Sequence, residues 1–141
     1  MAKYFTMSEM TYSSEANKYD IDNTPSEEIK EHLEELMEVL DTLREKWGTA
    51  IKVTSGYRCP ELNKKIGGSK TSVHMLGYGA DLKPFNNKLD KFFECAREWA
   101  KDNDFDQIIE ETSSNGGRWL HIGLYNNKGQ QRREVKKLKQ K

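Results

Sequence analysis

A chain of 141 residues can form one domain with a hydrophobic core. Hydrophobic residues make up 35% of it and charged residues 33%, and the mean hydropathy is −0.93, yet an aromatic share of 10% argues against disorder. Basic and acidic side chains both number 23, so the formal net charge is zero and a globally basic nucleic-acid-binding protein is not expected. No apolar run has the length of a membrane span, so we expect no membrane insertion.

The charges are unevenly distributed along the chain. Residues 1–50 carry 12 acidic and 5 basic side chains, whereas residues 128–141 carry 1 and 7. The basic tail is either a solvated, frayed end or a segment attracted to an anionic polymer or to the acidic N-terminal part. The first ten residues lack the basic and apolar regions of a signal peptide, and we expect synthesis in the cytosol.

The two cysteines have no C-x-x-C spacing, so neither a disulfide framework nor a cysteine zinc site is expected. Cys95 lies in an apolar helical pattern and is interpreted as a small buried hydrophobe. Cys59 could act as a nucleophile, but nothing near it in the sequence lowers its pKa, which favours a plain thiol.

Two helix starts are predicted in the N-terminal part. The run Thr6–Glu9 has the pattern of a capping box for a short first helix. A longer amphipathic helix is predicted from about residue 25 to Trp47, with Thr24 as its N-cap and Pro25 at its first position. Gly48 is expected to end it.

The remaining pattern predicts short helices and strands that do not alternate regularly. In chain order they are a strand at 50–54, a helix at 60–66, a loop at 69–79, a strand end at 80–82, a helix at 88–101 capped by Asn87, strands at 105–111 and 118–124, and an edge strand around 132–135. This order favours an α+β fold with an antiparallel sheet and flanking helices over a doubly wound fold. We expect residues 1–141 to form a single domain with a basic tail from about residue 128.

The histidines suggest a metal site. His32 lies among glutamates on the predicted long helix and is interpreted as a surface residue, whereas His74 lies in a loop and His121 on a strand. A catalytic zinc site has three protein ligands and an open fourth position, which His74, Asp81 and His121 could supply. Spacing alone is a weak signal for this, because a lone histidine is usually structural.

Several motifs occur together in a recognisable order. They are Ser55-Gly56-Tyr57-Arg58, Asn63, Gly67-Gly68, Ser72-x-His74-x-x-Gly77-x-x-x-Asp81 and Trp119-Leu120-His121-Ile122. With them, the stretch from about Phe5 to Val135 resembles the zinc D-Ala-D-Ala carboxypeptidase family, which includes phage endolysins and vancomycin-resistance dipeptidases. That family shares its fold with lysostaphin-type peptidases and the hedgehog N-terminal domain, so the resemblance implies such a fold here.

The resemblance also implies roles for individual residues. His74, Asp81 and His121 match the family's zinc ligands. Arg58 matches an arginine that stabilises the oxyanion or holds the scissile carbonyl, although a salt bridge that fixes its loop is an alternative.

Two further positions are expected to contact substrate. Ser72 matches a serine that lines the substrate cleft, while a turn-stabilising hydroxyl is an equal alternative. Tyr57, next to the matched arginine, is assigned to substrate binding as well.

The general base is the least regular part of the match. Many members carry an acidic residue three positions before the last histidine, where this chain has Arg118. Relatives with a Trp-x-His ending instead carry a glutamate at the end of the preceding strand, which Glu111 matches. Neighbouring strand side chains point to opposite faces, so only one of Glu110 and Glu111 can face the metal, and the alignment favours Glu111. Alternatively, both glutamates lie on the sheet surface and the protein binds metal without activity.

The sequence therefore predicts a monomeric zinc metallopeptidase that cuts the stem peptide of bacterial peptidoglycan. The expected activity is that of a D-Ala-D-Ala carboxypeptidase or an L-Ala–D-Glu endopeptidase, in phage or prophage lysis or in cell-wall remodelling. The enzyme would stay in the cytoplasm until it is released to the wall. The rivals are a non-catalytic zinc module that binds peptidoglycan or a protein, and a cysteine peptidase that uses Cys59.

Overall fold

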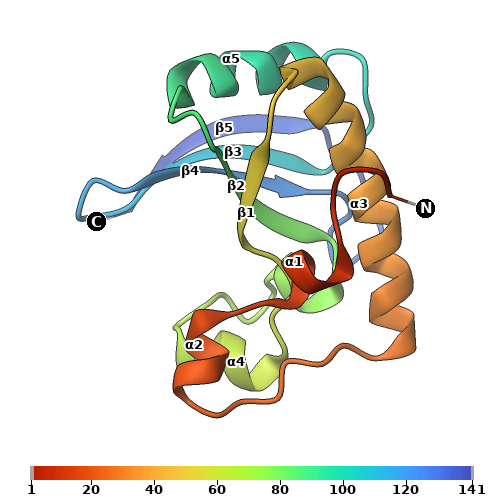
Figure 1. Cartoon of the computed structure of the whole chain (residues 1–141), viewed down its shortest axis with the longest axis vertical. Helices are drawn as coiled ribbons and strands as arrows, with labels where there is room; N and C mark the ends of the chain where they lie inside the picture. The colour runs from red at the N-terminus through yellow and green to blue at the C-terminus, as the bar shows by residue number, and fades with distance from the viewer. Residues whose placement is uncertain (1, 141) are drawn as a thin grey trace.

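The computed structural model describes residues 2–140, which form an α+β fold around one five-stranded sheet (Figure 1). In spatial order the strands are β1 (Ile51–Ser55), β2 (Gly79–Pro84), β4 (Arg118–Gly123), β3 (Gln107–Thr112) and β5 (Glu134–Lys139). The pairs β1–β2, β2–β4 and β3–β4 are antiparallel, as expected.

The last strand departs from the antiparallel prediction, because β5 runs parallel to β3 and makes the sheet mixed. After β4 the chain stays at the same end of the sheet, where the Arg133 N–H donates to the Phe105 carbonyl and the Glu134 N–H to the Asp106 carbonyl. It therefore enters the sheet beside the first residue of β3 and runs in the same direction. The basic tail is thus an edge strand over 134–139 rather than a frayed end.

One face of the sheet carries the hydrophobic core, which is covered by α3 (Glu27–Trp47) and α5 (Leu89–Ala100). The sheet residues that contribute to this core alternate along their strands and are Ile51, Ala80, Leu82, Ile108, Leu120 and Ile122. Because strand side chains alternate, the residues between them point to the opposite face. That opposite face carries the polar groups described below.

The helix starts follow the local capping chemistry. In α1 (Met7–Thr11) the predicted capping box is present, since Thr6 Oγ1 accepts from the Glu9 N–H and the Glu9 carboxylate accepts from the Thr6 N–H. For α3 the predicted N-cap Thr24 is wrong: Ser26 Oγ accepts from the Ile29 N–H.

Thr24 is instead engaged upstream, where its N–H donates to Asp22 Oδ1 in a turn that precedes the helix. For α5 the predicted cap Asn87 is also wrong, because its φ of 61° is left-handed and its N–H donates to the Pro84 carbonyl. The end of α3 is as expected, with Gly48 at a φ of 88°.

The remaining helices are short. They are α2 (Ser14–Lys18), α4 (Pro60–Lys65) and the 3₁₀-helix η1 (Val73–Leu76), the last of which lies within the expected loop. Figure 1 shows α2 and α4 together at the end of the molecule opposite α5. Among the described residues, no helix is both long and apolar enough to cross a membrane.

Candidate active site

Adjacent strands bring two of the predicted metal ligands together. Asp81 on β2 and His121 on β4 are direct register partners, and both lie on the sheet face opposite the core. His74 comes from η1, which packs against β2. The His121 Nδ1 atom lies 3.0 Å, and the His74 Nε2 atom 3.4 Å, from the same Asp81 Oδ1 atom.

These three residues can hold a metal ion, because one potential ligand atom from each lies within 4.8 Å of the others. The His74 Nδ1 atom lies 2.7 Å from the Gly56 carbonyl oxygen, which can only accept, so Nδ1 carries the proton and Nε2 presents its lone pair. Backbone carbonyls commonly orient metal-binding histidines in this way.

The local backbone explains why a glycine supplies that carbonyl. A Cβ atom on Gly56 would lie 2.2 Å from the Met10 carbonyl oxygen, so a side chain would collide with the backbone of α1. Past this point the Arg58 N–H donates to the His74 carbonyl over 3.1 Å. Two hydrogen bonds therefore join the segment after β1 to η1 and fix the position of His74.

The electrostatics favour the metal-binding forms of these groups. Burial lowers the pKa of His74, and the nearby charges of Arg58 and His121 lower it further. The negative charge of Asp81 opposes them and raises this pKa, but the net direction is downward. Burial alone raises the pKa of Asp81, but His74 and His121 outweigh it and hold the pKa well below its usual value. His74 is thus a neutral imidazole and Asp81 a carboxylate, the states in which these side chains bind metals.

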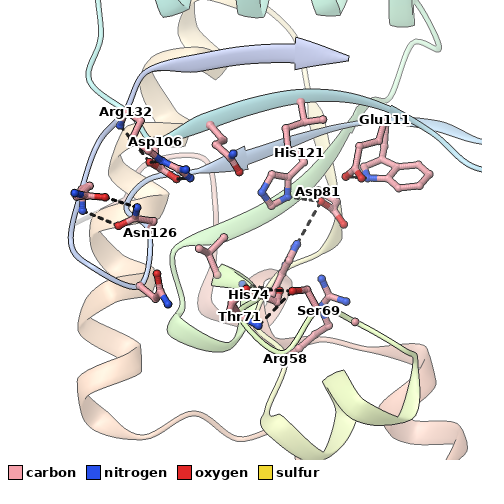
Figure 2. A pocket seen from close by; sticks show the side chains of 18 of the residues that line it. Arg58, Ser69, Thr71, His74, Asp81, Asp106, Glu111, His121, Asn126 and Arg132 are labelled. Carbon is pink, nitrogen blue, oxygen red and sulfur yellow. Dashed lines mark hydrogen bonds and ion pairs between the residues drawn. The ribbon is translucent and has the colours of Figure 1, made fainter. Parts of the chain in front are cut away.

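A cavity of about 780 Å³ opens over this group (Figure 2). The predicted site residues that line it are Arg58, Ser72, His74, Asp81, Glu111 and His121. Tyr57, which was expected to bind substrate, does not line it. Its side chain is only 7% exposed and packs in the hydrophobic core, because the chain after β1 turns and the Tyr57 N–H donates to the Met10 carbonyl.

The Arg58 side chain lines this cavity and forms no ion pair with any of the described residues. Its Nε atom is buried and has no hydrogen-bond acceptor, and no described carboxylate lies within ion-pair distance of it. Burial lowers the pKa of Arg58, opposed by the charges of Asp81 and Glu111. The described residues therefore do not form the salt bridge that was the alternative role for Arg58.

The Ser72 hydroxyl caps η1, since its Oγ atom accepts from the His74 N–H over 3.2 Å. The turn-stabilising role is thus present, and Ser72 also lines the cavity. Both expectations for this residue are compatible with its position.

The two glutamates of β3 face opposite sides of the sheet. Glu111 lines the cavity, and its Oε2 atom accepts a hydrogen bond of 2.9 Å from Trp119 Nε1. Glu110 points toward α5, where its Oε2 atom accepts from Arg97 Nη1 over 2.6 Å. Arg118 also lies on the α5 side, and its Nη2 atom donates to Asp90 Oδ1. The side chain facing the cavity is therefore that of Glu111, the one of the two glutamates that the family resemblance favoured.

Sequence reasoning missed the Trp119–Glu111 hydrogen bond and the pair formed by Asp106 and Arg132, which also lines the cavity. The first could have been found from the hairpin, because the turn between β3 and β4 makes Glu111 and Trp119 register partners. The second joins residues 26 positions apart and has no local signal. Cys59 caps α4 through its Sγ atom and is not among the described residues that line the cavity.

The two histidines and the aspartate form a group that could hold a metal ion, as a metallopeptidase requires. A family model described as Peptidase M15 matches residues 3–122, so the chain belongs to this family of zinc D-Ala-D-Ala carboxypeptidase-like enzymes. A search of curated proteins finds no match for the chain.

Proposed function

We propose that the protein is a zinc-dependent peptidase that hydrolyses the stem peptide of bacterial peptidoglycan, as a D-Ala-D-Ala carboxypeptidase or an L-Ala–D-Glu endopeptidase. One observation carries the proposal. In a member of the M15 family, a cavity brings a His-Asp-His cluster together with a carboxylate and an unpartnered arginine.

The donor set of the cluster fits zinc. Two imidazoles and one carboxylate are ligands that catalytic zinc accepts, with a further position left open. The Gly56 carbonyl, which holds the His74 ring, supports the same assignment. When bound there, zinc polarises a carbonyl group and activates a water molecule.

Glu111 is the proposed general base. Trp119 holds the Glu111 Oε2 atom, so we assign the Oε1 atom to accept the proton of the attacking water. The same atom would then return this proton to the leaving amine. Glu110 is excluded from this role by its ion pair with Arg97 on the other side of the sheet.

Arg58 is proposed to bind the scissile carbonyl and its developing negative charge. A buried guanidinium with an unpartnered Nε atom gains hydrogen bonds when an acceptor enters the cavity. Ser72 supports the site through the capped turn that carries His74.

Mass spectrometry of muropeptides digested with the zinc-loaded protein tests the proposal. We expect one defined peptide bond to be cut, with loss of activity in chelator and recovery after zinc addition. Retention of activity in chelator together with inhibition by iodoacetamide would instead indicate the cysteine peptidase. Binding to cell walls without any cleavage would indicate the non-catalytic module.

A further inference from the structure

The segment that follows β4 builds a wall of the cavity. It lies beyond residues 3–122, which the family model matches. Its cavity-lining residues are Asn126, Asn127, Lys128, Gln130 and Arg132. Figure 2 shows Asn126 and Arg132 on one side of the cavity, across from the side chains of His74, Asp81 and His121 and from Arg58.

Internal hydrogen bonds give this wall a defined shape. The Asn126 Oδ1 atom accepts from the backbone N–H groups of Lys128 and Gln130, both over 2.9 Å. The Gly129 N–H donates to the Asn126 carbonyl, and Gly129 adopts the left-handed φ of 72° that this turn needs. Lys128 therefore stands at the tip of a closed turn.

An ion pair between the buried Asp106 and the partly exposed Arg132 attaches the end of the wall to the residues before β3. Asp106, only 1% exposed, accepts from Arg132 Nε over 2.7 Å and from Arg132 Nη2 over 2.9 Å. The two charges of this bidentate pair neutralise each other. Of the two cations of the wall that line the cavity, Lys128 is then the one that remains available, because no described carboxylate lies within ion-pair distance of it.

We propose that the wall formed by residues 124–133 is a substrate subsite and that Lys128 binds a carboxylate group of the peptide, away from the bond that is cut. The inference rests on the proposed function and assigns its substrate to the acidic peptides. A cavity of about 780 Å³ has room for several residues of a peptide, so a chain held at Arg58 and the metal ligands also reaches this wall. Asn127 lies beside Lys128 on the wall and offers amide hydrogen bonds to the same group.

Binding measurements with paired peptides test the subsite independently of turnover. The protein is the zinc-loaded Glu111→Gln variant, alone and with Lys128→Gln or Lys52→Gln added. Lys52 is an exposed lysine of β1 outside the cavity and serves as the matched control. Each stem peptide is made with its glutamate carboxylate free or as the carboxamide, and with its terminal carboxylate free or as the amide. Calorimetry then gives the Kd of each form.

We expect at least one carboxylate peptide to bind about threefold to fivefold more tightly than its amide, as is usual for a solvent-exposed charge pair. Lys128→Gln should bring this ratio close to one, whereas Lys52→Gln should retain it, and added salt should reduce it. If Lys128→Gln left the ratio of the amide Kd to the carboxylate Kd unchanged for every peptide pair, the proposed subsite would be wrong. Absence of cleavage by the wild-type protein would overturn the peptidase proposal, and this separate measurement keeps the two failures distinguishable.

Discussion

The indole Nε1–H of Trp119 donates a 2.9 Å hydrogen bond to the Oε2 atom of Glu111, its register partner across the β3–β4 hairpin. Both side chains line the cavity over the His-Asp-His cluster. One carboxylate oxygen is thereby fixed by a rigid donor on the strand that also carries His121. We infer that Trp119 is a positioning residue for the proposed base.

Trp119→Phe should therefore lower kcat about tenfold while KM and bound zinc change little, because losing a group that orients a catalytic side chain typically costs ten- to a hundredfold. Steady-state kinetics on a muropeptide of known sequence measures this. Trp99→Phe is the matched control, since Trp99 Nε1 donates over 2.9 Å to Thr42 Oγ1 far from the cavity. It should reduce thermal stability and leave kcat unaltered. An equal loss of kcat in both variants would argue against a specific role for Trp119.

The two glutamates of β3 should differ sharply. Glu111→Gln is expected to keep the fold and the zinc yet lose about a hundredfold or more in kcat, because an amide cannot accept the proton. Glu110→Gln breaks only the ion pair with the half-exposed Arg97 and should cost no more than about 1 kcal/mol of unfolding free energy. Kinetics and denaturant unfolding of both variants check this. If Glu110→Gln lost activity and Glu111→Gln did not, the base would be Glu110, on the face of β3 opposite to the one proposed.

The metal cluster makes a prediction that needs no substrate. The purified protein should hold close to one zinc ion per chain, and His74→Ala or His121→Ala should lose it. Because the ion binds only where the folded chain brings the ligands together, chelator should lower Tm. Elemental analysis and thermal scans measure both effects. A wild-type protein that takes up no zinc even when zinc is added would contradict the site.

The order of the motifs and the family resemblance indicated the ligand set and favoured Glu111, and strand alternation predicted that only one of the two glutamates of β3 faces the cluster. Tyr57 could not be placed in this way. The backbone after β1 is irregular, and the direction of that side chain depends on a hydrogen bond to Met10, 47 positions earlier. The start of α3 was missed because two residues that can cap flank Pro25, and the turn at Asp22 that engages Thr24 has no strong pattern.

The parallel β5 and the Asp106–Arg132 pair had no local signal for a different reason. Both depend on the path of the chain after β4. Long-range contacts with β3 and with the residues that precede β3 determine this path. The charge run at 128–141 was visible in the sequence, but charge alone does not distinguish a solvated tail from an edge strand. Lysines along an exposed edge strand oppose pairing with other chains, which is consistent with their number on β5.

Substitutions of Arg58 and Arg118 distinguish an arginine that binds the reacting group from one with a structural role. Arg58→Lys keeps the charge but removes the planar fork, so kcat and kcat/KM should fall together by about a hundredfold. Arg118→Ala removes an ion pair with the exposed Asp90 on the α5 side and should change stability slightly and kcat little. Kinetics on one muropeptide compares them. A large kcat loss for Arg118→Ala, together with near-normal kinetics for Arg58→Lys, would mean that the substrate binds on the α5 side of the sheet and not in the cavity.

The ion pair between Asp106 and Arg132 should make stability depend on acid pH. Burial by itself raises the pKa of Asp106, but the hydrogen bonds and the charge of Arg132 outweigh it, and the folded-state pKa lies below the ordinary value of 3.8. A depressed carboxyl pKa contributes stability that is fully present above the unfolded-state pKa and disappears as the pH falls through the folded-state pKa.

Asp106→Asn should consequently lower the free energy of unfolding at pH 7 by about 1–2 kcal/mol, the range for a charged hydrogen bond whose arginine is partly exposed. The difference from wild type should persist down to about pH 4 and shrink below it, because the wild-type carboxyl then also becomes neutral. Urea unfolding between pH 7 and pH 2.5 measures this. Asp90→Asn, which removes the exposed pair with Arg118, should show a much weaker dependence on pH. A difference for Asp106→Asn that grows as the pH falls would mean that the folded-state pKa of Asp106 is raised, and that Arg132 does not compensate for its burial.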